Sequence, residues 1–156
     1  MLWDGGEVGA SELGWNMEDP FNLQRFVDAQ ASTYATALSE LRAGAKRSHW
    51  IWYIFPQIDG LGFSAMSKRY AIASVDEAEA YLAHPVLGTR LSECSEAVLS
   101  VQGRSTLQIM GSPDDMKLHS SMTLFAKVSD EGSVYHQVLD KYFDGAVDEA
   151  TMRLIS

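Results

Sequence analysis

The segment from Lys46 to Gln57, with the sequence KRSHWIWYIFPQ, constrains the fold most, because it concentrates aromatic side chains in a few positions. Two tryptophans, a tyrosine, a phenylalanine and a histidine fall within ten residues. The segment follows neither the period of an amphipathic helix nor the strict alternation of a half-buried strand. So many large aromatic side chains are rarely left in an exposed loop. We therefore expect it to form the centre of the core, as a helix or an extended segment, and one wall of a functional site.

Helical patterns with start and stop signals account for most of the remaining chain. Asp19 followed by Pro20 is typical of a helix start, and Gly44 is typical of a helix end. No two alternating apolar runs are joined by a hairpin turn. The sequence therefore predicts an all-α single domain of roughly seven helices around the irregular aromatic segment. The helical patterns run between Asp19 and Gly44, over Ala65–Ala73, from Ser74 to His84, from Pro85 to Gly103, over Ser105–Met110, from Ser112 to Phe125, over Val134–Phe143 and over Val147–Ile155.

The first sixteen residues differ in composition from the rest of the chain. Residues 1–16 contain four glycines and no lysine or arginine, and they show no apolar period. Met17 and the residues after it resemble a natural protein start. We therefore predict that residues 1–16 are a disordered N-terminal extension, so that Trp3 and Trp15 stay outside the core. Residues 17–156 form the predicted single helical domain, a size typical of one domain.

Composition excludes several classes of protein and site. No apolar run reaches the length of about eighteen residues that a membrane-spanning helix needs. The formal net charge of −9 argues against a nucleic-acid partner. The single cysteine, Cys94, excludes an internal disulfide and indicates a reducing, cytoplasmic location. Because Cys94 falls on an apolar helical stripe, we expect it in the core. No cofactor motif is complete, and four histidines are too scattered for a metal site of the zinc type: His49, His84, His119 and His136.

Basic residues gather around the aromatic segment of an otherwise acidic chain. Between residues 41 and 70, five lysines and arginines face a single acid, a local charge of +4 that leaves −13 on the rest of the chain. Such a region suits a small anionic ligand, phosphorylated or nucleotide-like, because aromatic side chains stack on rings and ammonium groups neutralise phosphate. The alternative of equal weight is that these charges solvate the rim of an aromatic core.

Candidate ligand-binding residues come from two parts of the chain. The first part runs from Lys46 to Ser64 and includes a turn in which Gly60 and Gly62 would let backbone N–H groups approach a ligand. The second part, Asp114–Ser121, carries a lysine and two serines at one-turn spacing, which could complete an anion site or form a solvated face. The candidates are Lys46, Trp50, Trp52, Tyr53, Gln57, Lys117, Ser120 and Ser121.

Two residues could support catalysis, although other roles compete with it. His49 is the candidate acid–base group, and Asp114 could orient it or a water molecule. No triad, metal cluster or carboxylate pair is recognisable, so the sequence leaves open whether the protein is an enzyme. One alternative is a non-catalytic module that binds a protein partner through exposed aromatic residues. Another is a structural role, in which His49, Gln30 and Gln57 are buried polar groups that fasten the core.

Together these residues form a pattern that resembles the domain-of-unknown-function 1810 family over about residues 20–155. Two blocks are specific to the resemblance: SHWIWYIFPQ at Ser48–Gln57 and KLHSSMTLF at Lys117–Phe125. The resemblance implies a compact, mainly helical fold and no established activity. Further matching positions are Arg25–Phe26, Gln30, Tyr34, Lys46, Gly60–Gly62, Tyr70–Ile72, Tyr81–Leu82, His84–Pro85, Leu87–Gly88, Arg90–Leu91 and Asp114.

Proteins of that family often carry the label calpastatin, which this sequence does not support. Calpain inhibitors of that name are long, disordered and repetitive, whereas this chain is short, patterned for a core and free of repeats. We therefore interpret the label, and the calpain inhibition it suggests, as an artefact of genome annotation.

A looser likeness links the layout of residues 81–91 to the YbiA-like N-glycosidases that act on NAD- and ADP-ribose-related compounds. It rests on Tyr81–Leu82, His84–Pro85, Leu87–Gly88 and Leu91. The acidic catalytic motif of that family has no clear match here, so the likeness suggests a ligand class alone.

Overall fold

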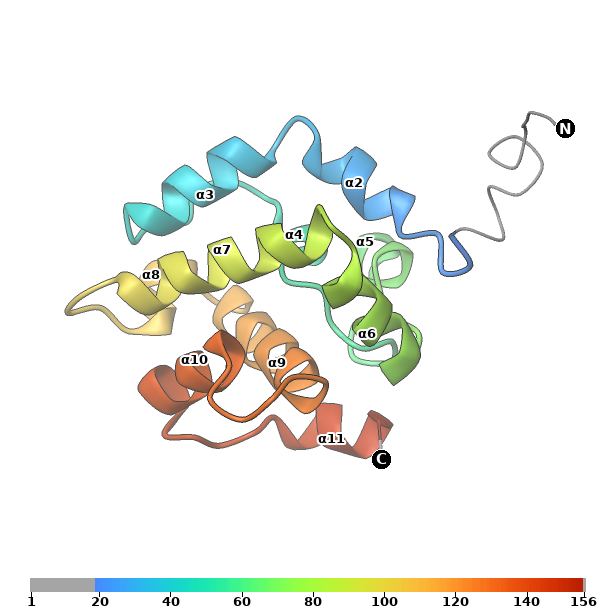
Figure 1. Cartoon of the computed structure of the whole chain (residues 1–156). Coiled ribbons are helices and arrows are strands. Elements are labelled where there is room, and N and C mark those ends of the chain that lie inside the picture. Colours follow the sequence, from blue (N-terminus) through green and yellow to red (C-terminus); the bar gives the residue numbers. More distant parts are fainter. Residues whose placement is uncertain (1–18, 156) are drawn as a thin grey trace, which may run out of the picture.

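Helices are the regular secondary structure of residues 19–155. The computed structural model describes residues 19–155 (Figure 1). That range contains ten helices and one isolated parallel bridge, between Ile58 and Ile72. The helices are α2 (Gln24–Gln30), α3 (Tyr34–Arg42), α4 (Ile51–Ile54), α5 (Ala65–Arg69), α6 (Val75–Ala83), α7 (Leu87–Ser100), α8 (Thr106–Met110), α9 (Asp114–Lys127), α10 (Val134–Phe143) and α11 (Glu149–Ile155).

Helix α7 lies at the centre of the bundle (Figure 1). It contacts α3, α6 and α10, while the other long helix, α9, contacts α4, α6, α8, α10 and α11. The central position follows from the apolar stripe of α7, on which Leu87, Leu91, Cys94 and Val98 are at most 1% exposed. Cys94 is a core residue, as predicted, and burial raises the pKa of its thiol to about 12.

A chain of aromatic rings connects the helices through the core. Neighbouring rings in this chain have centroids 5.1–6.0 Å apart, the range of favourable tilted and edge-to-face pairs. Because the rings come from α2, α4, α6, α9, α10 and the end of α5, they tie early and late parts of the sequence together. In order, the rings are Tyr53, Tyr70, Phe26, Tyr81, Phe125 and Tyr135.

The aromatic segment lies in the core, as the sequence predicts. It forms the one-turn helix α4, and Trp50, Ile51 and Phe55 are 0–1% exposed. The chain then extends, and the Ile72 N–H donates to Gln57 O while the Asp59 N–H donates to Ile72 O, both at 2.8 Å. These two bonds join the end of the segment to the strand-like connection between α5 and α6.

The prediction of one helix between Asp19 and Gly44 is wrong in two respects, because the helix starts later and is interrupted. Asn22 has a φ of +54°, which interrupts helical geometry, so α2 begins only at Gln24. The Asp19 carboxylate still caps it, accepting from the backbone N–H groups of Leu23 and Gln24 at 2.7 and 3.0 Å.

The same pattern is split into α2 and α3 because its two halves face different partners. Helix α2 packs on α4, whereas α3 packs on α7, and one straight helix could not serve both directions. This split, together with the formation of α4, turns the eight helical patterns of the sequence into the ten helices of the described residues, where roughly seven were expected.

Two other expectations concern the termini and membranes. The predicted extension at residues 1–16, with Trp3 and Trp15, falls outside the described residues. No helix between residues 19 and 155 combines the length and the apolar character that crossing a bilayer requires.

The corner between α6 and α7 depends on His84 and Gly88. The His84 Nδ1 accepts hydrogen bonds from the backbone N–H groups of Val86 and Leu87, at 3.1 and 3.2 Å, and so caps the start of α7. A Cβ atom added at Gly88 would lie 2.1 Å from the carbonyl oxygen of Leu82. Only glycine therefore allows the two helices to approach this closely.

We expect Gly88→Ala to lower the free energy of unfolding by about 1–3 kcal/mol, because the new methyl group meets backbone rather than a movable side chain. Urea denaturation measures the change. The matched control is Glu96→Ala on the exposed face of the same helix, which should change stability by no more than about 0.5 kcal/mol. Equal stability of the Gly88→Ala variant and the wild type would contradict this account of the corner.

Candidate functional site

One carboxylate, that of Glu40 in α3, holds the loop that leads into the aromatic segment. Its Oε1 accepts hydrogen bonds from the backbone N–H groups of Arg47 (2.9 Å) and Ser48 (3.0 Å) and from the Trp50 indole Nε1 (2.9 Å). Its Oε2 accepts from the Ser48 hydroxyl at 2.5 Å. Since four donors meet one carboxylate, Glu40 fixes the path of the loop and the position of Trp50.

These hydrogen bonds also change the pKa of the Glu40 carboxyl. Burial acts to raise that pKa, but the bonds from the Ser48 hydroxyl, the two backbone N–H groups and the Trp50 indole outweigh it and lower the pKa from 4.5 to about 2. No motif in the sequence singles out Glu40. The one available clue was an acid placed just before the basic, aromatic segment.

Asp114 bridges the two lysines that the sequence predicts as ligand contacts. The Lys46 Nζ lies 2.8 Å from Asp114 Oδ2, and the Lys117 Nζ lies 3.9 Å from Asp114 Oδ1. The Lys46 side chain is 6% exposed, whereas that of Lys117 is 24% exposed. Lys46 is therefore engaged in an internal ion pair, and Lys117 carries the more accessible charge.

Each of these lysines also lies over an indole ring. The Lys46 Nζ is 4.8 Å from the centroid of Trp50, and the Lys117 Nζ is 5.3 Å from the centroid of Trp52. Lys46 of the basic region at residues 41–70 and the start of α9, which are distant in sequence, thus meet at the aromatic segment.

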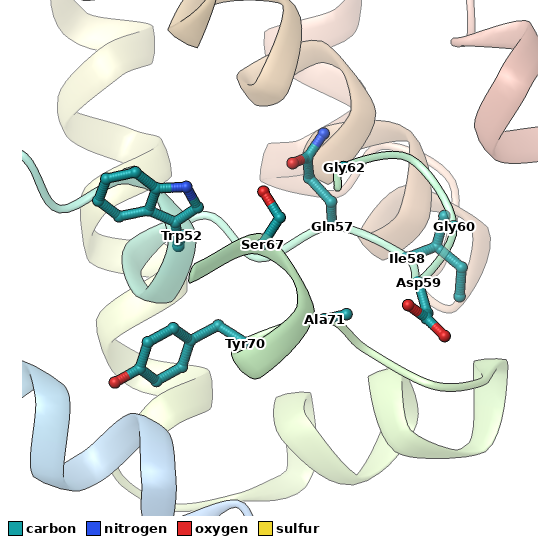
Figure 2. Close-up of a pocket in the computed structure, with 9 residues that line it drawn as sticks. All are labelled: Trp52, Gln57, Ile58, Asp59, Gly60, Gly62, Ser67, Tyr70 and Ala71. Carbon is teal, nitrogen blue, oxygen red and sulfur yellow. The ribbon is translucent and has the colours of Figure 1, made fainter. Parts of the chain in front are cut away.

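A small polar pocket opens beside Trp52, between α4, the glycine turn and α5 (Figure 2). Figure 2 shows the nitrogen-bearing edge of the Trp52 indole turned toward Ser67 and Gln57. The Trp52 Nε1 is buried and has no hydrogen-bond partner among the described residues. The enclosed space is about 10 Å³, which is room for one water-sized group. The pocket is lined by Trp52, Gln57, Ile58, Asp59, Gly60, Gly62, Ser67, Tyr70 and Ala71.

The glycine turn shapes this pocket through close packing. A Cβ atom at Gly62 would lie 2.5 Å from the Cβ of Ser67, and Gly60 has a φ of +108°. Ser64 caps α5 by accepting from the Ser67 N–H at 3.1 Å. The turn can therefore lie against α5 only because position 62 is glycine, while position 60 adopts a backbone conformation that favours glycine.

The remaining candidates do not all gather at this pocket. Trp50 and Tyr53 are core residues, 0% and 8% exposed. Ser120 donates to Asp148 Oδ2 at 3.1 Å, and Ser121 is fully buried with no hydrogen-bond partner among the described residues. His49 is exposed, and its ring makes no described contact with Asp114.

Gln30 takes the structural role that the sequence offered as one alternative. Its side chain is buried, and its Nε2 donates to the carbonyl oxygen of Tyr53 at 2.7 Å. Its Oε1 accepts from Arg90, at 3.3 Å. Gln30 thus ties α2 to the aromatic segment and to α7. Among the described residues, no group of three His, Cys, Asp or Glu side chains is arranged to hold a metal ion.

Comparison with known proteins shows the family. The model of the family described as "Protein of unknown function (DUF1810)" matches residues 20–155. The chain belongs to this family. The match confirms the resemblance predicted from the sequence, and it spans every site residue of the DUF1810 protein discussed above.

A solved structure shares the DUF1810 fold. The conserved hypothetical protein Rv1873 from Mycobacterium tuberculosis is 52% identical to this chain, with a TM-score of 0.86. The similarity covers 88% of this chain and 98% of that protein. A comparison with curated proteins found no match.

Glu40→Ala should lower the free energy of unfolding by about 2–4 kcal/mol, because it removes the acceptor of four donors, one of them the indole of a buried tryptophan. Urea denaturation measures the effect, and Glu79→Ala on the exposed face of α6 is the control. Equal effects of the two substitutions would contradict a special role for Glu40.

The pH dependence should follow from the lowered pKa. Because the folded-state pKa of about 2 lies below the ordinary value of 4.5, Glu40 stabilises the fold fully above about pH 5 and loses this contribution as the pH falls toward 2. The difference in unfolding free energy between wild type and Glu40→Gln should therefore shrink on acidification. A difference that stays constant between pH 7 and 3 would show that the charge of Glu40 does not matter.

Proposed function

We propose that this DUF1810 protein binds a small anionic ligand, phosphorylated or nucleotide-like, in the region formed by Lys46–Ser64 and Asp114–Ser121. The observation that carries the proposal is the Trp52 indole N–H, buried at the pocket wall without a partner among the described residues. A buried donor without an acceptor costs roughly 1–3 kcal/mol. An oxygen atom of a bound ligand would remove that cost.

Size and charge both favour an oxyanion as the group that enters the pocket. The enclosed 10 Å³ accepts one oxygen-sized group, so a terminal phosphate or carboxylate oxygen would enter while the rest of the ligand stays at the surface. The Lys117 ammonium lies over the Trp52 ring and supplies positive charge. The Gln57 amide at the same wall can donate as well. Lys46 would act indirectly, by holding Asp114.

An exposed aromatic ring beside the pocket favours a ligand that itself contains a ring. Phe63 follows Gly62 of the pocket wall, and it is 83% exposed. A nucleotide-like ligand could place its phosphate at Trp52 and stack its ring on Phe63. Catalysis by His49 and Asp114 is not part of the proposal, because Asp114 is held between two lysines.

The second candidate function is a protein-interaction module without a small-molecule site. Phe63 and Met116 are 83% and 66% exposed, and large exposed apolar side chains are common anchors for protein partners. Binding of a protein partner would depend on Phe63 but not on the indole N–H of Trp52. This difference separates the interaction module from the small-ligand site.

A thermal-shift screen of the full chain against orthophosphate, sugar phosphates, nucleotides, NAD and ADP-ribose tests the proposal. A ligand present at a hundred times its Kd should stabilise the protein by about 2.7 kcal/mol. We expect Trp52→Phe, which keeps a ring but lacks the N–H, and Lys117→Ala to weaken binding of the same ligand at least fivefold.

Arg104→Ala is the control, since it removes an exposed positive charge that does not line the Trp52 pocket. It should leave the shift unchanged. If no anion in the screen stabilises the wild type, or if all three variants respond like the wild type, the ligand site is refuted and the interaction module becomes the better account.

A further inference from the structure

A larger and more apolar pocket lies between α9, α10 and α11, and it shares no lining residue with the Trp52 pocket. Figure 1 shows these three helices as neighbours, coloured from orange to red. The volume of the pocket is about 220 Å³. It is lined by Thr123, Ala126, Lys127, His136, Leu139, Asp140, Gly145, Val147 and Met152.

The walls of this pocket are fixed by hydrogen bonds. The His119 ring stacks on Phe143 with centroids 4.1 Å apart, and its Nε2 lies 2.8 Å from the carbonyl oxygen of Ala146. Asp148 Oδ2 accepts from the Thr151 hydroxyl at 2.6 Å, while the Asp148 N–H donates to Thr123 Oγ1 at 2.9 Å. The connection from α10 to α11 is therefore anchored on both sides of the pocket, which is preformed rather than a product of loose packing.

The interior of the pocket is apolar and of a definite size. Ala126, Leu139, Val147 and Met152 supply its apolar walls. An apolar cavity of about 150 Å³ is known to hold a benzene molecule. A pocket of 220 Å³ therefore has room for a group the size of a phenylalanine, leucine or methionine side chain.

The pocket is lined by the titratable side chains of Lys127, His136 and Asp140. Lys127 and Asp140 are exposed, and neither makes an ion pair or a side-chain hydrogen bond within residues 19–155. His136 Nδ1 lies 2.7 Å from the Ser133 hydroxyl, which itself accepts from the His136 N–H. Nδ1 is therefore engaged by Ser133, whereas Nε2 makes no hydrogen bond within residues 19–155 and can face a ligand. One turn of α10, about 5–6 Å, separates His136 from Asp140.

We propose that this pocket binds a free amino acid with a large apolar side chain. The side chain would fill the apolar interior, which matches it in volume. The ligand carboxylate would face Lys127 and His136, and its ammonium group would face Asp140. A simple fatty or aromatic acid would leave Asp140 beside a like charge, and an amine would do the same with Lys127, so the zwitterion is the ligand that satisfies all three groups.

Titration of the full chain with a matched set of small molecules tests this assignment. L-phenylalanine carries the ring and both charges, phenylacetate carries the ring and the carboxylate, and phenethylamine carries the ring and the ammonium group. Glycine carries both charges without a ring. Methyl resonances of Leu139, Ala126 and Met152 report whether a ligand enters this pocket. We expect L-phenylalanine, at up to about 10 mM, to shift these methyl resonances. The two singly charged analogues should bind threefold to tenfold more weakly, and glycine should not bind.

Two exposed substitutions should invert the selectivity without disturbing the fold. Asp140→Asn should weaken phenylalanine binding about threefold to tenfold and make phenylacetate the better ligand. Lys127→Ala should do the opposite and favour phenethylamine. Arg104→Ala, which removes an exposed positive charge that lines neither pocket, is the control and should change none of these affinities.

Three results would overturn the proposal. Methyl resonances that do not move with any ligand would show that the pocket is not a binding site. Phenylacetate binding as well as phenylalanine, or unchanged preferences in the Asp140→Asn and Lys127→Ala variants, would refute recognition of the zwitterion. Because both variants change exposed residues, their melting temperatures should match that of the wild type. If either variant loses melting cooperativity, Asp140→Ser and Lys127→Gln are measured in its place.

Discussion

The carboxylate of Glu40 is the interaction on which the centre of this structure depends. It gathers two backbone N–H groups, a hydroxyl and an indole from the loop at Arg47–Trp50. With that loop fixed, Trp50 is buried, α4 can begin at Ile51, and Trp52 reaches the surface side of the helix. A charged acceptor for several donors is stronger than the sum of neutral hydrogen bonds in the same place, which suits a loop that is too aromatic to be left in water.

Helix α9, which is distant in sequence, meets the aromatic segment and gives it its chemistry. The start of α9 brings Asp114 and Lys117 against the segment, where Asp114 neutralises Lys46 and leaves Lys117 over Trp52. The two lysines therefore differ in role, because Lys46 is held in an internal ion pair whereas Lys117 is accessible. The unpartnered Trp52 N–H beside the accessible lysine is the feature on which the proposed ligand site rests.

The elements that sequence analysis predicted best are those whose signals are local. Helix α10 runs over Val134–Phe143 as predicted, because the Ser133 cap, the apolar stripe and the glycine after it all lie within the helix itself. The helix expected between Asp19 and Gly44 failed for the opposite reason, since its break is imposed by two different packing partners. The site divides in the same way. The cluster of lysines and aromatic residues in the sequence indicated the region of the candidate site. Glu40 went unnoticed because its partners are backbone groups and an indole that only the tertiary fold brings to it.

The central claim is that the indole N–H of Trp52 is a donor kept for a ligand, whereas that of Trp50 is already used by Glu40. The most direct measurement is a ¹H–¹⁵N spectrum of the indole groups, assigned with Trp52→Phe, during titration with orthophosphate and with a nucleotide. The account predicts that the Trp52 indole resonance moves to lower field as it gains an acceptor, while the Trp50 resonance stays in place. A Trp52 resonance that ignores both anions, or one that moves no more than that of Trp50, would contradict it.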